Sequence, residues 1–249
     1  AVAELMFIDF IGVCMDQLVN NAAKMRYMFG GQVKVPFTMM TRIGAGFGAA
    51  AQHSESYYSI FSHFPGLKGV VPSDAYTAKG LLTAAIRDDD PVIVFEHKGL
   101  YGIKGPVPEE AYELPLGKAR TVRSGTDITL VGISKMTWVC TAAAEELAKS
   151  GIDAEVIDLL SVSPIDYDHV IDSVRRTHRL VVVDEDTPIC SLAGDICARV
   201  AEEAFDYLDA PPSRVTAPHT PVPYSRVLEN NYVPNESRVI STVQRLLNR

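Results

Sequence analysis

The sequence has 249 residues, of which 47% are hydrophobic and 22% are charged, so it can bury the core of one large or two medium domains. Its 31 acidic residues outnumber the 23 basic ones and give a formal net charge of −8, which argues against a nucleic-acid partner. No apolar run reaches the roughly 18 residues of a membrane-spanning helix and no basic-then-apolar leader comes first, so we expect no membrane association and a location in the cytoplasm or an organelle matrix.

The first hundred residues predict alternating strands and helices. Runs of β-branched or continuously apolar residues predict strands at residues 1–5, 33–40, 69–72 and 91–95. Apolar residues at three- and four-residue spacing predict one amphipathic helix over residues 9–29, which Gly30 and Gly31 end, and another over residues 73–85. A strand, a helix and a further strand in succession predict a right-handed parallel crossover.

The second half repeats this alternation after a segment rich in Gly, Pro and Glu. We interpret residues 106–118 as a linker between domains at residues 1–105 and 119–249. Beyond it, strands are predicted at residues 127–134, 154–160 and 180–183, and helices at residues 137–149, 165–178, 192–208 and 236–247. Ser163, Pro164 and Asp166 offer a capping hydroxyl, a first-turn proline and an N3 carboxylate to the helix at 165–178. The predicted fold class is α/β.

A glycine-rich stretch from Arg42 to Ser54, which contains His53, is the leading candidate site. Small residues let a backbone approach a ligand closely, and an imidazole can donate and accept protons near neutral pH. The glycine spacing fits neither the P-loop nor the dinucleotide fingerprint, so a nucleotide-binding loop is disfavoured. From the residues alone, His53 is either a functional residue or an ordinary loop or core histidine.

Other reactive residues lack the spacing of a known site. The other five histidines have no metal-ligand spacing, and Ser134 and Ser191 lack a nucleophile elbow, so a zinc enzyme and a hydrolase are disfavoured. We predict that the cysteines are buried, reduced thiols. These cysteines are Cys14, Cys140, Cys190 and Cys197.

Several segments resemble the beta subunits of thiamine-diphosphate-dependent 2-oxo acid and acetoin dehydrogenases. They are residues 3–10 with Asp16-Gln17, residues 48–54, residues 64–68 continuing to 85–91, Glu96-His97-Lys98, and residues 211–224. This ordered similarity covers effectively the whole chain and is more specific than any single motif. It implies a transketolase-like fold, in which a pyrimidine-binding domain, incomplete at its N-terminus here, precedes an open α/β C-terminal domain.

The resemblance implies roles for three residues. Phe10 matches the aromatic residue that packs on the aminopyrimidine of thiamine diphosphate, and Met6 matches an apolar neighbour of that ring. For both, core packing is the alternative. His53 matches the active-site histidine that orients substrate and assists acyl transfer to a lipoyl group, a role that suits an imidazole.

The resemblance also implies a structural monovalent cation, commonly K⁺, held by backbone carbonyls near a helix C-terminus. A negative helix end and neighbouring acidic residues favour a cation, whereas a solvated turn at residues 88–90 is the alternative. The matching positions are Phe37, Ala85, Ile86, Asp88 and Asp90.

In the family, the cofactor lies between subunits of an α2β2 heterotetramer. The alpha subunit holds the diphosphate and its Mg²⁺, and a lipoyl acyltransferase component receives the acyl group. The glutamate that activates the cofactor lies, in the family, upstream of the position that matches Ala1, so we expect a polypeptide beginning at Ala1 to be unable to complete the reaction. Gly194-Asp195 and Asn230-Asn231 only superficially match the Mg²⁺-diphosphate motif, and we interpret them as part of a helix and as a turn.

The resemblance predicts a subunit that cleaves acetoin and transfers the acyl fragment to lipoamide. Residues 64–67, 87–91 and 96–98 are closer to acetoin-type subunits, and a pyruvate dehydrogenase beta subunit is the close alternative. A non-catalytic docking or scaffold subunit is a second hypothesis. It rests on acidic stretches at residues 184–186 and 202–203 that would face a basic partner, with an ordinary solvated surface as the alternative.

Overall fold

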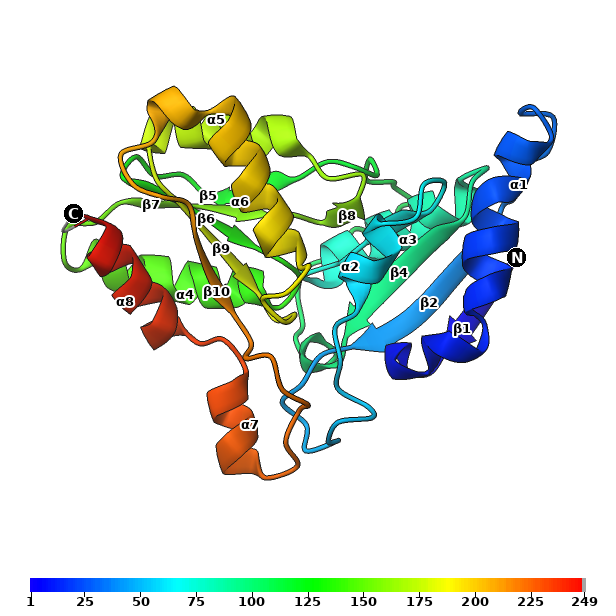
Figure 1. Cartoon of the computed structure of the whole chain (residues 1–249), viewed down its shortest axis with the longest axis horizontal. Helices are drawn as coiled ribbons and strands as arrows, with labels where there is room; N and C mark the ends of the chain where they lie inside the picture. The colour runs from blue at the N-terminus through cyan, green and yellow to red at the C-terminus, as the bar shows by residue number, and fades with distance from the viewer. Residues whose placement is uncertain (248–249) are drawn as a thin grey trace. The chain divides into compact units, whose positions relative to one another are not determined.

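The computed structural model describes residues 1–247, which form two compact units, each with its own five-stranded sheet (Figure 1). The chain does not divide between them at one point. Unit 1 contains Ala1–Gly117, Leu160–Pro164 and Val222–Arg226, and unit 2 contains the remainder. No helix within residues 1–247 is long and apolar enough to cross a membrane.

The sheet of unit 1 is parallel except for its last strand. Its strands, in spatial order, are β1 (Val2–Leu5), β2 (Thr38–Ile43), β4 (Val92–His97), β3 (Lys68–Val70) and β8 (Ser161–Ser163). The chain runs from β3 through helix α3 (Ala75–Arg87) to β4, which lies parallel to β3, so the predicted crossover is confirmed. β8 is antiparallel to β3, and the Ser163 hydroxyl donates to the Leu67 carbonyl at 2.8 Å.

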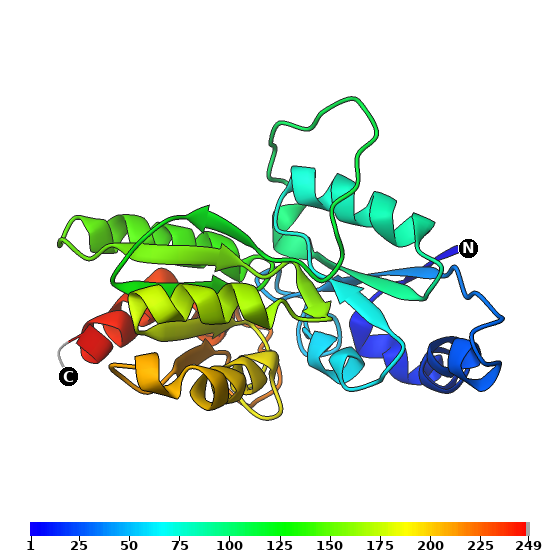
Figure 2. The ribbon, with the colours of Figure 1, turned by 90° about the horizontal axis from the view of Figure 1, so that it is seen from above.

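Helices cover both faces of the unit 1 sheet (Figure 2). α3 lies on one face, and α2 (Tyr58–Ser62) lies with the N-terminal helical segment on the other. α3 begins with a capping box, in which the Asp74 carboxylate accepts the Thr77 amide at 2.7 Å while the Thr77 hydroxyl accepts the Asp74 amide.

The single helix predicted over residues 9–29 is wrong in detail. The segment is helical, but it consists of a 3-10 helix η1 (Ile8–Val13), a π-helix η2 (Gln17–Ala22) and a short α1 (Ala23–Met28). Its buried side chains explain the change. Ile8 and Ile11 are three residues apart, which suits a three-residue turn, and apolar spacing alone does not distinguish these helix types.

Residues 101–117 run alongside α3 as a long loop (Figure 2). Lys79 donates to three carbonyls at residues 108–110, and the Tyr112 hydroxyl donates to the Tyr76 carbonyl at 2.7 Å. The Leu114 amide donates to the Gly80 carbonyl at 3.2 Å. A Cβ at residue 80 would lie 2.6 Å from Leu114 Cγ, so this close approach requires the glycine.

The sheet of unit 2 is also parallel with one antiparallel edge strand. Its strands, in spatial order, are β10 (Ser213–Thr216), β9 (Leu180–Asp184), β6 (Ile128–Gly132), β7 (Ala154–Asp158) and the antiparallel β5 (Arg120–Arg123). Every residue of β6, β7 and β9 is buried. Burial on both faces explains why most residues of these strands are apolar.

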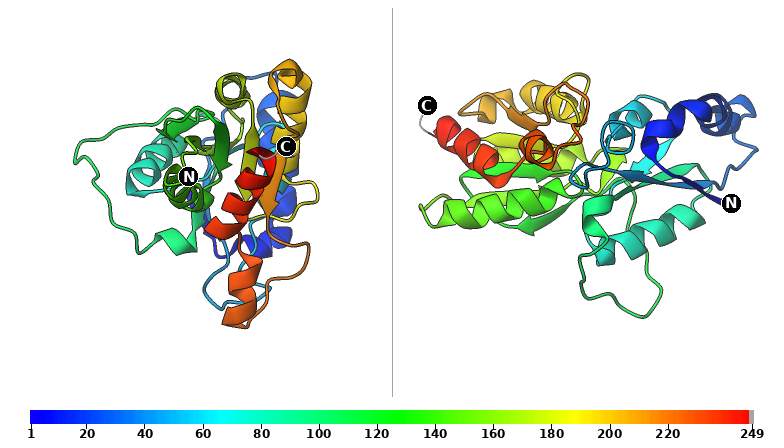
Figure 3. Two further views of the ribbon diagram at one scale, coloured as in Figure 1. Left: turned by 90° about the vertical axis from the view of Figure 1, so that its left-hand side faces the viewer. Right: turned by 90° about the horizontal axis from the view of Figure 1, so that it is seen from below.

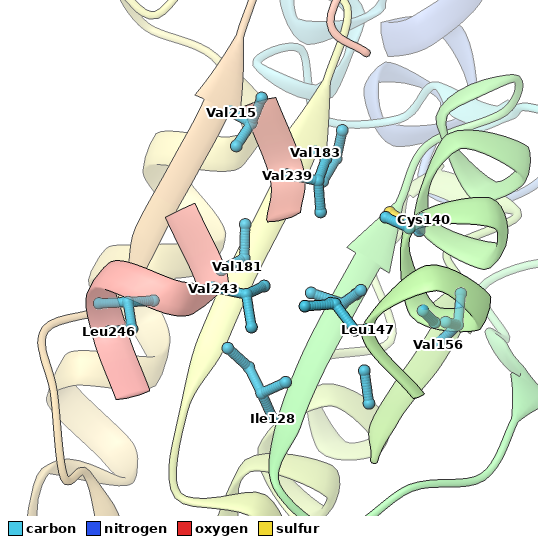
Figure 4. Packing of buried hydrophobic residues seen from close by; sticks show 14 of the residues in the cluster. Ile128, Cys140, Leu147, Val156, Val181, Val183, Val215, Val239, Val243 and Leu246 are labelled. Carbon is cyan, nitrogen blue, oxygen red and sulfur yellow. The ribbon is translucent and has the colours of Figure 1, made fainter. Parts of the chain in front are cut away.

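Strand alternation places the helices of unit 2 on two faces. Ile128 and Leu130 of β6 join a core with α4 (Met136–Ala148) and α8 (Glu236–Leu247), as Figure 4 shows for Ile128. Thr129 between them bonds Ser173 and Thr177 of α5 at 2.6 Å, and therefore points to the other face. α5 (Tyr167–Thr177) and α6 (Leu192–Glu203) pack together there (Figure 3).

Several local predictions for the second half are wrong. The N-cap of α5 is Asp166 rather than Ser163, because Ser163 belongs to the edge strand β8. α6 ends at Glu203, and only the 3-10 helix η4 (Phe205–Tyr207) follows it. Asp195 lies in α6 as expected, but Asn230 and Asn231 lie in a helix, α7 (Arg226–Tyr232), instead of a turn.

All four cysteines are free, but they are not all buried. Cys140 is fully buried, and burial raises the pKa of its thiol. Burial also raises the pKa of Cys197 to about 12. Cys190 is exposed, as is its preceding neighbour Ile189, and Cys14 and Cys197 are only partly buried, so the burial prediction is confirmed in full only for Cys140.

Candidate functional site

The candidate site lies at one edge of the unit 1 sheet. β1, β2 and β4 are parallel neighbours, so their carboxyl ends meet at the same edge. Residues 6–10 follow β1, residues 44–57 follow β2, and residues 98–101 follow β4. The three segments meet around His53. Ligands of open α/β sheets bind outside the carboxyl ends of strands, which makes this edge the expected place for a site.

His53 is half-buried and is held between two aromatic rings. Its imidazole makes edge-to-face contacts with Phe7, at 5.1 Å between ring centroids, and with Phe10, at 5.4 Å. The Lys98 ammonium donates to the His53 carbonyl and lies 4.9 Å from the Phe7 ring centroid. Both the ring and the backbone of His53 therefore have packing or hydrogen-bond partners.

Met6 and Phe10 do not belong to the core. Met6 is 56% exposed and Phe10 is 39% exposed, whereas Ile8 between them is fully buried. The buried Ile8 anchors the segment, and Phe10 lies at the surface against His53. The core-packing alternative for Met6 and Phe10 is thus wrong, and both side chains are open to a ligand.

Arg42, the penultimate residue of β2, connects β1 with the segment after β4. Its guanidinium pairs with Glu4 at 2.9 Å and donates to the Met6 sulfur at 3.2 Å. It also lies 5.9 Å from the ring centroids of Phe7 and Tyr101, a cation–π distance. A positive charge is therefore fixed beside the exposed apolar side chains.

Two carboxyl groups in this region have raised pKa values. Burial, with a smaller contribution from neighbouring Asp9, raises the pKa of Glu55 to about 7. Burial also raises the pKa of Glu96, which accepts the Tyr101 hydroxyl at 2.9 Å. The pKa of Tyr101 rises to about 12 through burial and its contact with Glu96. Groups with perturbed pKa values gathered in one region support a functional role.

Within the glycine-rich stretch, the local structure requires a glycine at residue 44. This residue has a φ of +97°, and a Cβ on it would lie 2.2 Å from the imidazole of His97, which is buried. His97 is held in turn, because its Nδ1 accepts the Gly99 amide at 3.0 Å. The glycine thus lets β2 and β4 approach closely where both strands end.

The positions expected to hold K⁺ lie around the C-terminus of α3. The Phe37 carbonyl accepts the Val92 amide at 2.9 Å, and the Ala85 carbonyl accepts the Thr38 hydroxyl at 3.0 Å. Ile86, next to Ala85, has an exposed side chain. A carbonyl oxygen has two lone pairs, so one such bond leaves each oxygen able to bind a cation.

The acidic residues after α3 form ion pairs. Lys68 pairs with Asp88 at 2.8 Å, Lys34 with Asp89 at 2.7 Å, and Arg26 with Asp90 at 2.6 Å. Burial opposes the shift, but hydrogen bonds from Arg26 and Lys68 lower the pKa of Asp90. Each of the three carboxylates therefore has a basic partner. No group of three or more His, Cys, Asp or Glu residues within residues 1–247 is placed to hold a metal ion.

Sequence reasoning missed Asp9, Arg42, Lys98 and Tyr101 as members of this site. Arg42 and Lys98 stand within motifs that were singled out, yet their partners come from other strands. Their common signal is position, because each lies at or just after the carboxyl end of a strand. The order of the strands brings them together, and that order is not evident from any one segment.

Comparison with known proteins agrees with this architecture. Residues 1–104 match the transketolase pyrimidine-binding domain family, and residues 117–239 match the transketolase C-terminal domain family. A split-gene transketolase, solved as an inactive beta4 tetramer, shares the fold with a TM-score of 0.80 at 22% identity, over 99% of this chain and 75% of that one. The fold and the site thus define a protein of the transketolase-like class.

Relatives of higher identity narrow the class. The chain is 54% identical over 246 residues to the beta subunit of acetoin:2,6-dichlorophenolindophenol oxidoreductase of Bacillus subtilis, over 99% of this chain and 72% of the relative. The subunit of the same name from Cupriavidus necator is 52% identical, with 99% and 73% covered. The mitochondrial pyruvate dehydrogenase E1 component subunit beta of Ascaris suum is 45% identical, with 99% and 70% covered. The chain belongs to this family of dehydrogenase beta subunits.

Proposed function

We propose that this chain is the beta subunit of a thiamine-diphosphate-dependent dehydrogenase that cleaves acetoin and passes the acyl fragment to lipoamide. The observation that carries the proposal is His53, held between Phe7 and the exposed Phe10. Identities of 54% and 52% to acetoin oxidoreductase subunits, against 45% to a pyruvate dehydrogenase subunit, favour acetoin as the substrate. Pyruvate is the alternative.

The residues of this site fit one part of the cofactor. An aminopyrimidine is a flat aromatic ring, and it needs an apolar surface with an aromatic side chain at hand. Phe10 and Met6 offer this surface, and both belong to residues 1–105, to which we assign pyrimidine binding. We assign the diphosphate and Mg²⁺ to an alpha subunit in an α2β2 assembly. When bound, thiamine diphosphate supplies the carbanion chemistry that breaks a carbon–carbon bond beside a carbonyl.

His53 is the proton-transfer group in this proposal. An imidazole can give or take a proton near neutral pH, and the Phe7 and Phe10 edges fix its plane. Lys98 holds its backbone carbonyl, so the ring needs little reorganisation when substrate arrives. Phe10 covers one side of the imidazole. Loss of the imidazole should reduce acyl transfer more than cofactor binding.

We further propose that K⁺ binds at the C-terminus of α3. The carbonyl oxygens of Phe37 and Ala85 each retain a lone pair, and the helix end is negative. Asp88 and Asp90 add negative charge near the ion, although Lys68 and Arg26 partly neutralise them. The unfolding midpoint should rise in K⁺ relative to choline at equal ionic strength, and no difference would reject the site.

The deciding experiment is an activity assay of the natural gene product that contains this sequence, co-expressed with its alpha subunit. Reduction of 2,6-dichlorophenolindophenol is followed with acetoin and pyruvate side by side, with and without thiamine diphosphate. We expect thiamine-dependent reduction, faster with acetoin. An assembled complex that is inactive with both substrates would reject the proposal.

A scaffold function is less well supported. Asp184, Glu185 and Asp186 are buried, so the expectation of an exposed acidic stretch there is wrong. Glu202 and Glu203 are exposed, but Glu203 pairs with Arg199 on its own helix at 2.6 Å. Docking to a lipoyl acyltransferase component remains part of our proposal. A pure scaffold predicts that replacing His53 changes nothing, which the same assay tests.

A further inference from the structure

One segment, residues 7–10, touches both sides of His53. Phe7 and Phe10 meet the imidazole, and between them Asp9 meets the backbone that follows it. The three contacts come from the start of η1, just after β1. The aromatic contacts orient the ring. The Asp9 contact acts on the main chain, and neither the sequence nor the comparisons assign it a role.

Within the part of the chain that the structure describes, the Asp9 carboxylate forms hydrogen bonds only with the backbone that follows His53. Its Oδ1 accepts the amide of Ser54 at 3.1 Å and the amide of Glu55 at 3.2 Å. Its Oδ2 is buried and has no hydrogen-bond partner among residues 1–247. Hydrogen bonds to a carboxylate are about twice as strong as those between neutral groups. The two residues after His53 are therefore tied to one side chain.

The support for Asp9 is rigid. Ile8 and Ile11, on either side of Asp9, are buried in the core of unit 1. The Thr41 hydroxyl of β2 donates to the Leu5 carbonyl at 2.9 Å and fixes the end of β1 just before this segment. Asp9 is therefore fixed relative to the sheet, and its hydrogen bonds hold the turn at residues 53–55 in place relative to the sheet.

We propose, on the basis of the proposed function, that Asp9 is a positioning residue that holds His53 at the distance from Phe10 that the reaction requires. Phe10 is the cofactor-facing aromatic residue, and Asp9 is its immediate neighbour. Adjacent residues of one anchored turn thus position both the aromatic surface for the cofactor and the imidazole that transfers the proton. A ligand that packs on Phe10 meets an imidazole whose main chain is already fixed.

The neighbouring Glu55 supports this arrangement. Asp9 contributes to the raised pKa of Glu55, so the two carboxyl groups interact electrostatically as well as through the backbone. Replacing Asp9 by Asn should therefore lower the pKa of Glu55. A purely steric role of the Asp9 side chain would leave the pKa of Glu55 unchanged.

The test uses the gene product in complex with its alpha subunit and the variants Asp9→Ala and Asp9→Asn. Asn retains an oxygen that can accept both amides, whereas Ala retains none. Asp172→Asn, an exposed carboxylate on α5 that pairs only on its own helix, is the matched control. Three quantities are measured: amide hydrogen exchange at residues 54–56, the rate at which diethyl pyrocarbonate modifies His53, and kcat and KM with acetoin.

We expect Asp9→Ala to exchange these amides faster, to expose His53 to the reagent, and to lose about tenfold or more in kcat with a smaller change in KM. Asp9→Asn should restore slow exchange and most of kcat, and the control should match the wild type. Unchanged exchange and His53 modification in Asp9→Ala would overturn the proposal. So would faster exchange with an unchanged kcat, since Asp9 would then have only a structural role.

Failure of the proposed function would look different. In that case the wild-type complex would be inactive with acetoin and pyruvate. Hydrogen exchange and His53 modification would still decide whether Asp9 positions the imidazole, because neither measurement depends on turnover.

Discussion

The carboxyl edges of the two sheets differ, although both sheets are largely parallel. In unit 2, β7 and β9 end in Asp158 and Asp184. Both side chains are completely buried, and both carboxylates accept hydrogen bonds. Asp158 bonds Arg120 at 2.9 Å and Thr137 at 3.0 Å, and Asp184 accepts the amides of residues 186 and 193. In unit 1, the same edge leaves Met6 and Phe10 exposed and Glu55 with a raised pKa.

One architecture can therefore stabilise a fold at one sheet edge and form a site at another. An edge whose polar groups are all paired contributes stability, and it offers nothing to a ligand. A sheet edge that leaves apolar and ionisable groups accessible is less stable, but these groups can bind a ligand or take part in a reaction. We therefore expect substitutions at the unit 2 edge to affect folding first and those at the unit 1 edge to affect activity first.

The largest effect should come from His53→Gln, which removes the proton-transfer group and preserves the approximate side-chain volume. We expect kcat with acetoin to fall about a hundredfold or more, with little change in the unfolding midpoint. The assay is dye reduction by the alpha–beta complex. His63→Gln is the control, because His63 is exposed and lies outside the site. Equal losses in both variants would contradict the assignment.

Asp158→Ala should be the most damaging change at the unit 2 edge. It leaves the Arg120 guanidinium without its buried partner, and we expect the free energy of unfolding to fall by about 3–5 kcal/mol. Trp138, the only tryptophan, lies in α4, so its fluorescence in a urea titration reports on unit 2. Replacing the exposed Asp172 of α5 by Ala should cost less than about 0.5 kcal/mol. If the two variants lost similar free energies of unfolding, the unit 2 edge would contribute no more stability than an exposed surface residue.

Gly44→Ala should have a smaller effect, which lowers both stability and activity. The added Cβ meets the His97 ring at a φ of +97°, so we expect a loss of more than about 1 kcal/mol in stability together with reduced activity. Gly48→Ala is matched, since Gly48 also has a positive φ but nothing lies within 4 Å of its added Cβ. If circular dichroism melts gave the two variants the same midpoint, the close approach to His97 would be unimportant.

The smallest effect is a pH dependence from Glu55. Its pKa is 4.5 ordinarily and about 7 in the folded protein. The folded protein therefore binds more protons than the unfolded chain between these values, and the free energy of unfolding falls as the pH rises from 4.5 to 7. Above pH 7 this cost is fully present. Urea titrations at several pH values should show a flatter profile for Glu55→Gln, and an unchanged slope would exclude Glu55 as the cause.

The sequence predicted the α/β class, the crossover and the family, because the central strands are rich in apolar residues and the similarity spans the chain. It missed β5, β8 and β10, which are short edge strands with partly exposed residues, and α7, whose Val227 and Leu228 are exposed. Such short elements leave no periodic apolar pattern that is long enough to predict them.

The site was only partly predictable. The resemblance predicts roles for His53, Met6 and Phe10, but the contact between Phe10 and His53 depends on β1 lying beside β2. Residues 184–186 were expected at the surface because acidic residues usually are exposed. The Asp184 carboxylate instead accepts two backbone amides, and composition carries no information about such partners.

The strand β8 has a consequence for how the protein is made. It completes the sheet of unit 1 but is encoded after β6, α4 and β7 of unit 2, about 90 residues beyond its partner β3. At a translation rate of about 5–20 residues per second, the first sheet waits several seconds for its last strand. A ribosome therefore cannot release a finished first unit before it has made a large part of the second. A gene cut at the linker would separate β3 from the strand that covers its edge.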